Sequence, residues 1–171
     1  ESGFDGEVQS GPDSFSNLTY LVMEYVEGEC LFDVAMKLGP LGEENGKAIF
    51  SQLLDVMIYL AENQIAHIDL KLENIVVDRK MNIKLLDFGF AQDQHINKLT
   101  KYRGTKTYMA PEIRKREEYD GTQADVFSSG VLLFILVVGN FPFTQASLKE
   151  QYYNLSQSRD KSKYWKVAAK R

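Results

Sequence analysis

The stretch HIDLKLEN, at residues 67–74, places three chemically active side chains within six positions. Asp69 offers a carboxylate that can accept a proton, Lys71 an ammonium group, and Asn74 an amide oxygen. As isolated residues, Asp69 would more simply cap a turn and Lys71 would lie on the surface. Their close spacing, directly before the β-like run IVVD, favours a shared site.

Three further motifs follow this stretch in order. DFG occupies residues 87–89, MAPE residues 109–112 and DVFSSG residues 125–130. Four ordered motifs of this kind are hard to obtain by chance. Polar side chains concentrate in the segments that flank the predicted hairpin of residues 74–87, and such loop segments are where binding and catalytic groups gather.

The elements that position these motifs can be read from apolar periodicity. Residues 43–63 predict a long helix with one face in the core. Residues 74–78 and 82–87 predict two short strands joined as a tight hairpin. Residues 124–138 have helical apolar character, and VLLFILVV at 131–138 is expected to be buried. In the helix predicted at residues 43–63, the apolar positions are Ile49, Phe50, Leu53, Leu54, Met57 and Ile58.

Other parts of the chain carry weaker signals. The first seventeen residues contain four acids, three glycines and a proline, and are expected to be mostly loop. Residues 18–26, LTYLVMEYV, predict a largely buried strand that runs into the connector EGE. Residues 92–108 lack periodicity, which is typical of a functional or disordered loop. The basic tail from residue 158 is expected to be a solvated helical end.

Composition excludes several classes of function. The chain has 171 residues and a formal net charge of -4, which gives no sign of a nucleic-acid surface. Cys30 is its single cysteine, so no internal disulfide and no zinc cluster are expected, and an intracellular, cytoplasmic location fits best. The longest apolar run is far shorter than the roughly 20 residues that span a bilayer, so no membrane segment is expected.

The four motifs resemble those of the eukaryotic protein kinases of the serine/threonine type. HIDLKLEN is similar to the catalytic loop, DFGFA to the metal-binding turn and GTKTYMAPE to the end of the activation segment. The resemblance implies an α+β fold, mainly the helical large lobe with a remnant of the β-rich small lobe. It covers roughly residues 18–165, and GNFPF (139–143) is loosely like the calmodulin-dependent group. The domain boundaries that it implies are a loop or small-lobe remnant at 1–17 and a partial kinase domain at 18–171.

The resemblance also implies roles for the catalytic residues. Asp69 would orient the substrate hydroxyl and accept its proton, and Lys71 would neutralise the γ-phosphate of ATP. Asn74 and Asp87 would bind Mg²⁺, which prefers hard oxygen ligands. Thr105 would bond Asp69 and Lys71. In the same turn as Asp87, Phe88 would pack inward and Gly89 would supply a bend free of a Cβ atom.

Further positions carry over to nucleotide binding and to structural support. Met23, Glu24, Tyr25 and Val26 resemble the gatekeeper and hinge, although a buried edge strand is the competing interpretation. In the hinge reading, Glu24 and Val26 would meet the adenine through their backbones. The remaining positions are Val76 as an apolar floor, Glu73 as a further ATP-binding residue, Asp125 as the holder of the catalytic loop and Glu112 as the partner of a distant arginine.

Four positions depart from the family pattern. Ile68 stands where many kinases have an arginine that pairs with a phosphorylated activation segment, so control by such phosphorylation is not expected. Lys101, beside Thr100, occupies the place of the usual phosphothreonine and would supply a fixed positive charge. Cys30 stands where glutamate is frequent, which weakens any statement about recognition of ribose or of a basic substrate residue. Phe127 stands where tryptophan is frequent and is expected to be a packing variant.

A larger departure is what the sequence does not contain. It has no GxGxxG motif, and its first lysine, Lys37, follows the expected hinge. We therefore expect a fragment whose full-length parent transfers phosphate from ATP, with Mg²⁺, to protein substrates, whereas the fragment alone is inactive. A pseudokinase or scaffold with the same fold is the alternative, and an unrelated phosphate-binding or metal hydrolase domain is the third reading. No regulatory partner can be read from the sequence.

Overall fold

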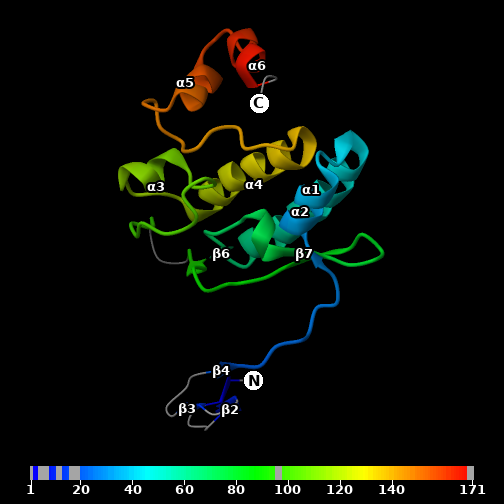
Figure 1. Ribbon diagram of the computed structural model, residues 1–171. Helices are drawn as coiled ribbons and strands as arrows, with labels where there is room; N and C mark the ends of the chain where they lie inside the picture. The colour runs from blue at the N-terminus through cyan, green and yellow to red at the C-terminus, as the bar shows by residue number, and fades with distance from the viewer. Residues whose placement is uncertain (1, 4–7, 11–12, 16–19, 95–97, 169–171) are drawn as a thin grey trace.

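The computed structural model describes residues 2–3, 8–10, 13–15, 20–94 and 98–168. Figure 1 shows a helical body and, apart from it, a group of short strands near the N-terminus, joined by an extended segment. The described helices are α1 Leu31–Leu38, α2 Gly42–Glu62, α3 Pro111–Lys115, α4 Gly121–Val138, α5 Gln151–Gln157 and α6 Ser162–Ala168, with a 3₁₀ turn η1 at Leu72–Asn74. The described strands are β1 Ser2–Gly3, β2 Val8–Ser10, β3 Asp13–Phe15, β4 Tyr20–Leu21, β5 Glu29–Cys30, β6 Ile65–Ala66, β7 Ile75–Val77, β8 Ile83–Leu85 and β9 Gln92–Asp93.

The two long helices α2 and α4 lie against each other and form the centre of the body. Helix α2 buries Ile49, Leu53 and Met57 at spacings of four, as its periodicity predicted. Leu54 and Ile58 are exposed, because no described element covers that side of the helix. The predicted helix is confirmed, and its buried face is narrower than expected.

Helix α4 begins at a defined cap and buries one face in the core as far as Leu136. The side chain of Asp120 accepts a hydrogen bond from the backbone N–H of Gln123 at 3.0 Å, which satisfies one of the unpaired donors of the first turn. By length and composition α4 could pass for a membrane span, but half of its residues are buried inside the fold. Such burial is typical of a core helix, which is what the sequence predicted for residues 131–138.

A three-stranded antiparallel sheet in the order β5-β7-β8 lies beside these helices. Val76 pairs with Cys30 on one side and with Lys84 on the other. Strands β7 and β8 are the predicted hairpin, shorter by one or two residues at each end than expected. Ile75 and Val77 are buried in the same apolar cluster as Leu53 of α2, so the sheet and the helices share one core.

The extended segment that follows β4 contradicts the predicted buried strand at residues 18–26. Only Tyr20–Leu21 is a strand there, residues 18–19 lie outside the described part, and residues 22–28 have no regular structure until a bend at Gly28. Met23 is 68% exposed and Tyr25 90%. A strand needs a sheet face to bury its side chains, and the described neighbour of β4 is the two-residue strand β1.

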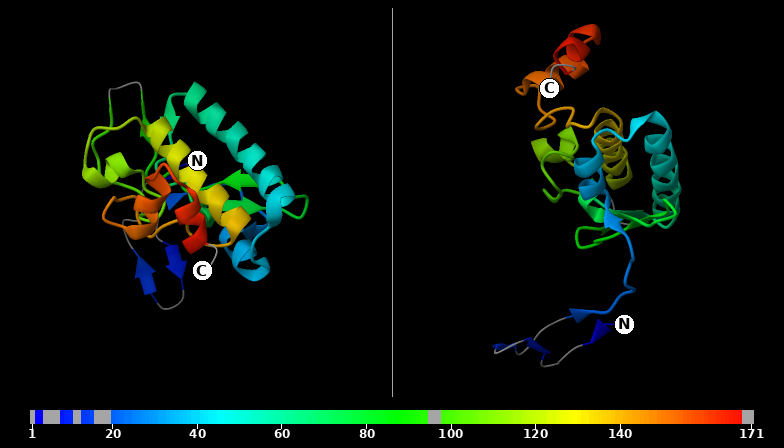
Figure 2. Two further views of the ribbon diagram at one scale, coloured as in Figure 1. Left: turned by 90° about the horizontal axis from the view of Figure 1, so that it is seen from above. Right: turned by 45° about the vertical axis from the view of Figure 1, so that its right-hand side comes forward.

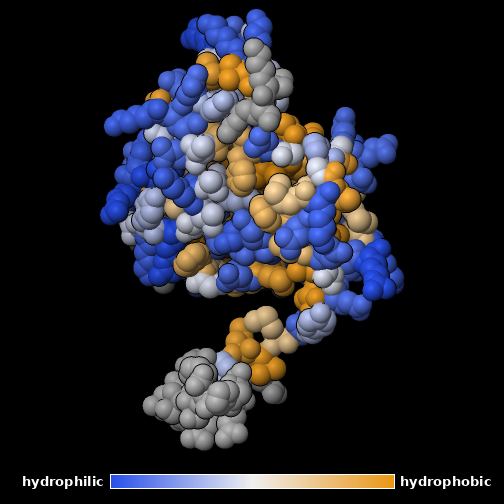
Figure 3. Space-filling model, viewed as in Figure 1, coloured by the Kyte–Doolittle hydropathy of each residue, from blue (hydrophilic) through white to orange (hydrophobic). Residues whose placement is uncertain are grey.

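The N-terminal residues also differ from the predicted loop. Strands β2 and β3 pair antiparallel, with Val8 opposite Phe15 and Ser10 opposite Asp13. Gly11 and Pro12 stand between them in the sequence and are residue types that favour turns. Figure 2 shows these strands set away from the helical body, and Figure 3 shows apolar surface on the adjoining segment that begins at Tyr20.

Candidate active site

The catalytic-loop motif begins where β6 ends and lies in the interior. Residues 66–70 are all buried. Ile68 adopts φ 69°, a left-handed conformation that is rare for a β-branched residue. Asp125 of helix α4 supports this bend, because its carboxylate accepts hydrogen bonds from the backbone N–H groups of His67 at 2.6 Å and Ile68 at 2.8 Å. The contact predicted for Asp125 is present.

Burial dominates the electrostatics of Asp125. It raises the pKa of this carboxyl to about 6, although the two backbone donors favour the charged form and oppose the rise. The carboxylate comes from the first turns of a core helix and holds a loop that lies 57 residues earlier in the chain. The loop geometry is therefore fixed by the fold of the whole body.

His67 provides a second support for the loop. Its Nδ1 accepts a hydrogen bond from the backbone N–H of Asp69 at 3.2 Å, and its Nε2 lies 3.0 Å from the carbonyl oxygen of Leu86. These partners fit the neutral tautomer with the proton on Nε2. Burial lowers the pKa of His67, which also favours the neutral ring. His67 thus connects Asp69 to the residue that precedes Asp87.

The carboxylate of Asp69 is the most heavily bonded group in the site. One oxygen accepts from the backbone N–H and the hydroxyl of Thr105, both at 2.7 Å. The other oxygen accepts from Lys71 Nζ at 2.6 Å and from the Asn74 amide at 3.3 Å. Burial tends to raise the pKa of Asp69, but the hydrogen bonds from Lys71 and Thr105 outweigh it and hold that pKa below its usual value.

Lys71 and Thr105 also contact each other directly. The Lys71 ammonium group donates to the Thr105 hydroxyl at 3.1 Å. The structure therefore brings together the three residues that the sequence predicted as catalytic, from two segments 34 residues apart. Gly104 makes this approach possible, because a Cβ atom there would lie 2.7 Å from the carbonyl oxygen of Ile68 and its φ is +103°.

Asn74 and Asp87, the predicted metal ligands, are linked through the backbone. The N–H of Leu86, next to Asp87, donates to the carbonyl oxygen of Asn74 at 2.8 Å. The Asn74 side chain donates an N–H of its amide to the carbonyl oxygen of Asp69 at 3.0 Å, so its side-chain oxygen is the atom that the predicted metal role would use. Asp87 is exposed, and among the described residues no cluster of three His, Cys, Asp or Glu side chains forms a metal site by itself.

The DFG turn differs in detail from what was expected. The positive φ, 59°, belongs to Asp87, and the backbone N–H of Gly89 donates to its carboxylate at 3.1 Å. Phe88 contacts the ring of His67 edge-on at 4.9 Å but is 47% exposed. The prediction that Phe88 packs inward is therefore wrong in part, because no described segment covers its outer face.

The predicted nucleotide-binding residues fall into two groups. Val76 is half-buried in the central strand β7, and Glu73 accepts a hydrogen bond from the Tyr108 hydroxyl at 3.2 Å. Met23 and Glu24 are exposed on the extended segment, with Glu24 forming a surface ion pair with Lys84. Val26 is half-buried on the same segment. Val26 lines a pocket together with Val76, and none of Met23, Glu24 and Val26 is among the residues that bond the Asp69 carboxylate.

Ile68 packs in a small apolar cluster rather than facing a charge. Its neighbours in that cluster include Met109, Tyr119 and the half-buried Leu99. The Tyr119 hydroxyl donates to the carbonyl oxygen of Lys101 at 2.8 Å. Apolar packing and one hydrogen bond therefore connect the segment around Lys101 to the loop that carries Ile68. In the resemblance described above, an arginine at the position of Ile68 would make this connection through its charge.

Two supporting residues were not assigned a role from the sequence. His67 lies inside the quoted motif, and its position two residues before Asp69 is the only signal that pointed to it. Tyr108 is buried, and its backbone N–H donates to the carbonyl oxygen of Thr105 at 3.0 Å. Ser128 in turn donates to the carbonyl oxygen of Tyr108 at 3.0 Å. Nothing in local periodicity marks Tyr108, since its role depends on contacts across the fold.

Comparison with known proteins adds an independent line of evidence. The model of the family described as "Protein kinase domain" matches residues 13–170. "CBL-interacting protein kinase 1" of Oryza sativa subsp. japonica is 40% identical over 140 residues, 80% of this chain and 30% of the relative. "Putative sperm motility kinase W" of Mus musculus is 40% identical over 131 residues, 76% and 26% of the two chains. "CBL-interacting protein kinase 21" of rice is 42% identical over 128 residues, 72% and 24%. The matched region is thus less than a third of each relative.

Proposed function

Because this chain belongs to the protein kinase family, we propose that the protein carrying it transfers the γ-phosphate of ATP to serine or threonine hydroxyls of other proteins. The observation that carries the proposal is the buried carboxylate of Asp69, which binds both Lys71 and Thr105. In phosphoryl transfer the protein mainly positions the reactants and supplies countercharge. An acid and an ammonium group held in one rigid site meet that need.

Asp69 is proposed to orient the attacking hydroxyl and accept its proton. The hydroxyl oxygen forms a bond to phosphorus, the bond from phosphorus to the departing ADP oxygen breaks, and the hydroxyl proton moves to the carboxylate. The lowered pKa of Asp69 keeps the carboxylate ionised at neutral pH, so it is ready to accept a hydrogen bond. Asn74 and Thr105 fix its direction.

Lys71 is proposed to exchange partners when substrate binds. Its ammonium group lies 2.6 Å from the Asp69 carboxylate, and 19% of the Lys71 side chain is exposed. A terminal phosphate would compete for this ammonium group, because charge-assisted hydrogen bonds to phosphate are short and strong. Movement of Lys71 toward the phosphate would leave that Asp69 oxygen with only the 3.3 Å bond from Asn74, and so able to accept the substrate hydroxyl.

A divalent cation, which we propose to be Mg²⁺, fits the oxygen atoms of Asn74 and Asp87. Both are hard donors, and Mg²⁺ typically takes one or two protein ligands and completes its shell with water and phosphate oxygens. When bound, the cation supplies positive charge that neutralises the phosphates. The backbone bond between Leu86 and Asn74 keeps the two ligand-bearing segments together.

The adenine is proposed to lie against Val76, with the backbones of Glu24 and Val26 and the side chain of Met23 completing its site. Val76 supports this, since it is half-buried in the strand next to Cys30. The other three lie on the extended segment and need a partner surface to fix them.

We also propose an intracellular, cytoplasmic location, on the evidence of the single free Cys30.

The test compares two variants in the whole protein that carries this chain. Asp69→Asn should lower phosphate transfer by about 10²- to 10⁴-fold while ATP affinity stays unchanged, because only the proton acceptor is lost. Asp87→Asn should also weaken nucleotide binding in the presence of Mg²⁺. Phosphate transfer is measured with radiolabelled ATP and a generic protein substrate. If Asp69→Asn transfers phosphate as fast as wild type, the proposal is ruled out. A wild-type protein that binds ATP without transfer would instead favour the pseudokinase alternative.

A separate proposal concerns control of the activation segment. Since Ile68 is buried among apolar groups, the segment around Lys101 is proposed to hold its position without phosphorylation. The prediction is that Thr100→Ala leaves the turnover of the whole protein within about twofold of wild type. A strong rise in turnover on phosphorylation of Thr100 would contradict it.

A further inference from the structure

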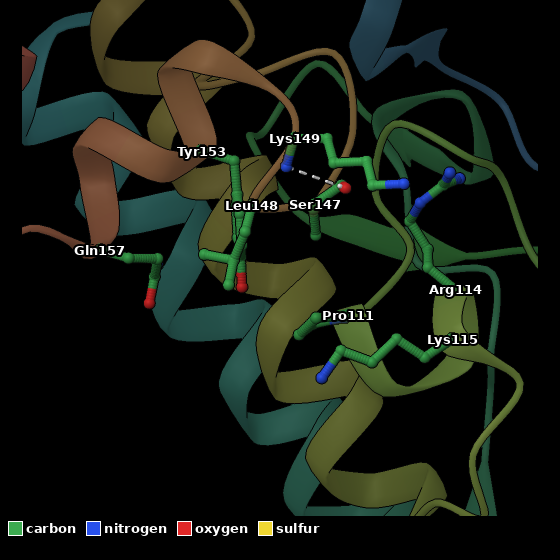
Figure 4. Close-up of a pocket in the computed structure, with 9 residues that line it drawn as sticks. Pro111, Arg114, Lys115, Ser147, Leu148, Lys149, Tyr153 and Gln157 are labelled. Carbon is green, nitrogen blue, oxygen red and sulfur yellow. Dashed lines mark hydrogen bonds between the residues drawn. The ribbon is translucent and has the colours of Figure 1, made fainter.

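A pocket of about 480 Å³ lies on the side of the body formed by α3, α5 and the loop between α4 and α5. Figure 4 shows three basic side chains around it, Arg114, Lys115 and Lys149. None of the nine residues that line it is acidic. Its apolar part comes from Pro111, Ala146, Leu148 and Tyr153, and its remaining lining residues are Ser147 and Gln157.

The guanidinium group of Arg114 is held in place by neutral partners. It donates to Gln145 Oε1 at 2.6 Å and lies 3.5 Å from the Tyr102 hydroxyl. Its Nε is buried and has no hydrogen-bond partner among the described residues. Since Nε is inaccessible, a ligand would meet the terminal nitrogens, where the bonds to Gln145 and Tyr102 use one N–H each and a second N–H on each can bind an acceptor. No described carboxylate forms an ion pair with it.

Lys149 and Ser147 offer further donors at the same pocket. Lys149 is exposed, has no ion pair among the described residues, and extends in Figure 4 toward the same end of the pocket as Arg114. The backbone N–H of Lys149 donates to the Ser147 hydroxyl oxygen at 3.3 Å, so that hydroxyl can point its own proton elsewhere. Lys115 is 3.8 Å from Glu117, a weak pair because both side chains are largely exposed.

Two acidic groups lie near the pocket, and both act on Tyr153, one of its lining residues. The Glu150 carboxylate accepts from the backbone N–H of Tyr153 at 2.6 Å and caps α5. The charge of Glu112 contributes to the raised pKa of Tyr153, behind the effect of burial. Neither acid lines the pocket. Its charge is therefore dominated by the three cations.

We propose that this pocket binds an acidic peptide segment of a protein partner, with an aliphatic side chain on the apolar floor and a carboxylate at Arg114 and Lys149. The inference rests on the proposed function only because it takes the ligand to be a protein. It adds that the proteins recognised by the kinase carry an acidic segment. The pocket is tied to the site, since α3 follows directly after Tyr108, which bonds Thr105. A peptide held here would leave the Asp69 region free.

The test is peptide binding measured without ATP. The probe is a fluorescein-labelled nonapeptide with a leucine beside two glutamates. The control peptide has the same sequence with both glutamates replaced by glutamines. Wild-type protein should bind the acidic peptide about tenfold more tightly by fluorescence anisotropy, and the difference should shrink as salt rises from 50 to 300 mM.

Two variants give the proposal its sharpest check. Lys149→Glu and Arg114→Gln should each weaken binding of the acidic peptide about tenfold, whereas Lys80→Glu, an exposed lysine on the β7–β8 turn, should leave it unchanged. Circular dichroism reports whether each variant is folded, and Lys149→Glu alone is decisive because that side chain is exposed. Equal binding of the two peptides, or an unchanged Lys149→Glu, would overturn the proposal. Asp69→Asn should bind the peptide normally, so a failure of the proposed chemistry is seen separately.

Discussion

The catalytic loop and the extended segment after β4 were both assigned functional residues from sequence, yet the fold treats them differently. In the loop, Asp69 receives hydrogen bonds from Lys71, Asn74 and Thr105. In the extended segment, Met23 and Tyr25 are largely exposed. The difference shows that the residues proposed to transfer phosphate are held together by the helical body itself, whereas the segment proposed to contact adenine has few contacts with that body.

The largest effect expected from this comparison is at Asp125. Replacing it with alanine removes the acceptor of two buried N–H groups, each of which costs about 1–3 kcal/mol when unsatisfied. Asp125→Ala should therefore lower the free energy of unfolding by about 4 kcal/mol, measured by urea denaturation. The matched change Asp120→Ala removes only an exposed cap and should cost about 1 kcal/mol. Equal losses would mean that the loop is not held through Asp125.

A smaller effect is expected at Gly104. The change Gly104→Ala forces a Cβ atom against the Ile68 carbonyl at a φ of +103°, which should cost about 2 kcal/mol. It should also displace Thr105 from Asp69. The change Gly130→Ala is the control, since nothing lies near a Cβ atom there. If Gly104→Ala unfolds at the same urea concentration as wild type, the close approach is not a constraint.

Acidification should distinguish the two buried titrating groups. The pKa of His67 is lowered in the fold, so below about pH 6.5 the unfolded chain takes up a proton that the folded chain does not, and stability is lost. Asp125 acts in the opposite direction, because its pKa is raised to about 6 and the folded chain holds the extra proton as pH falls below that value. In Asp125→Asn the stabilising proton uptake by Asp125 is absent, so only the loss due to His67 remains. This variant should therefore lose stability more steeply than wild type between pH 7 and 5, as measured by thermal unfolding at each pH. A shallower slope in Asp125→Asn would contradict this assignment.

The smallest effect is expected on the extended segment. Tyr25→Ala should change the free energy of unfolding of the chain by less than about 0.5 kcal/mol, because the side chain is 90% exposed. Tyr108→Ala is its buried counterpart and should cost about 4 kcal/mol. A large loss in Tyr25→Ala would show that the segment packs on the body and would remove the contrast between the two regions.

The same contrast explains what the sequence could predict. Helix α2 and the β7–β8 hairpin follow from local periodicity, which each segment carries in its own residues. The contacts of Asp69, Lys71 and Thr105 were expected only through the family resemblance, since 34 residues separate Lys71 from Thr105. His67 and Tyr108 were missed because their roles arise from tertiary contacts. The buried strand at residues 18–26 was wrong because apolar composition specifies burial only where a covering surface exists.

Helix α4 carries Asp125 two turns before the residues that pack at the centre of the core. A molecule that stiffens residues 67–69 must therefore also restrain the helix that the rest of the body is built on. Amide exchange would slow along α4 and its neighbour α2, far from the bound molecule. Binding at the loop of residues 67–69 would then be detected on chain segments that do not contact the bound molecule.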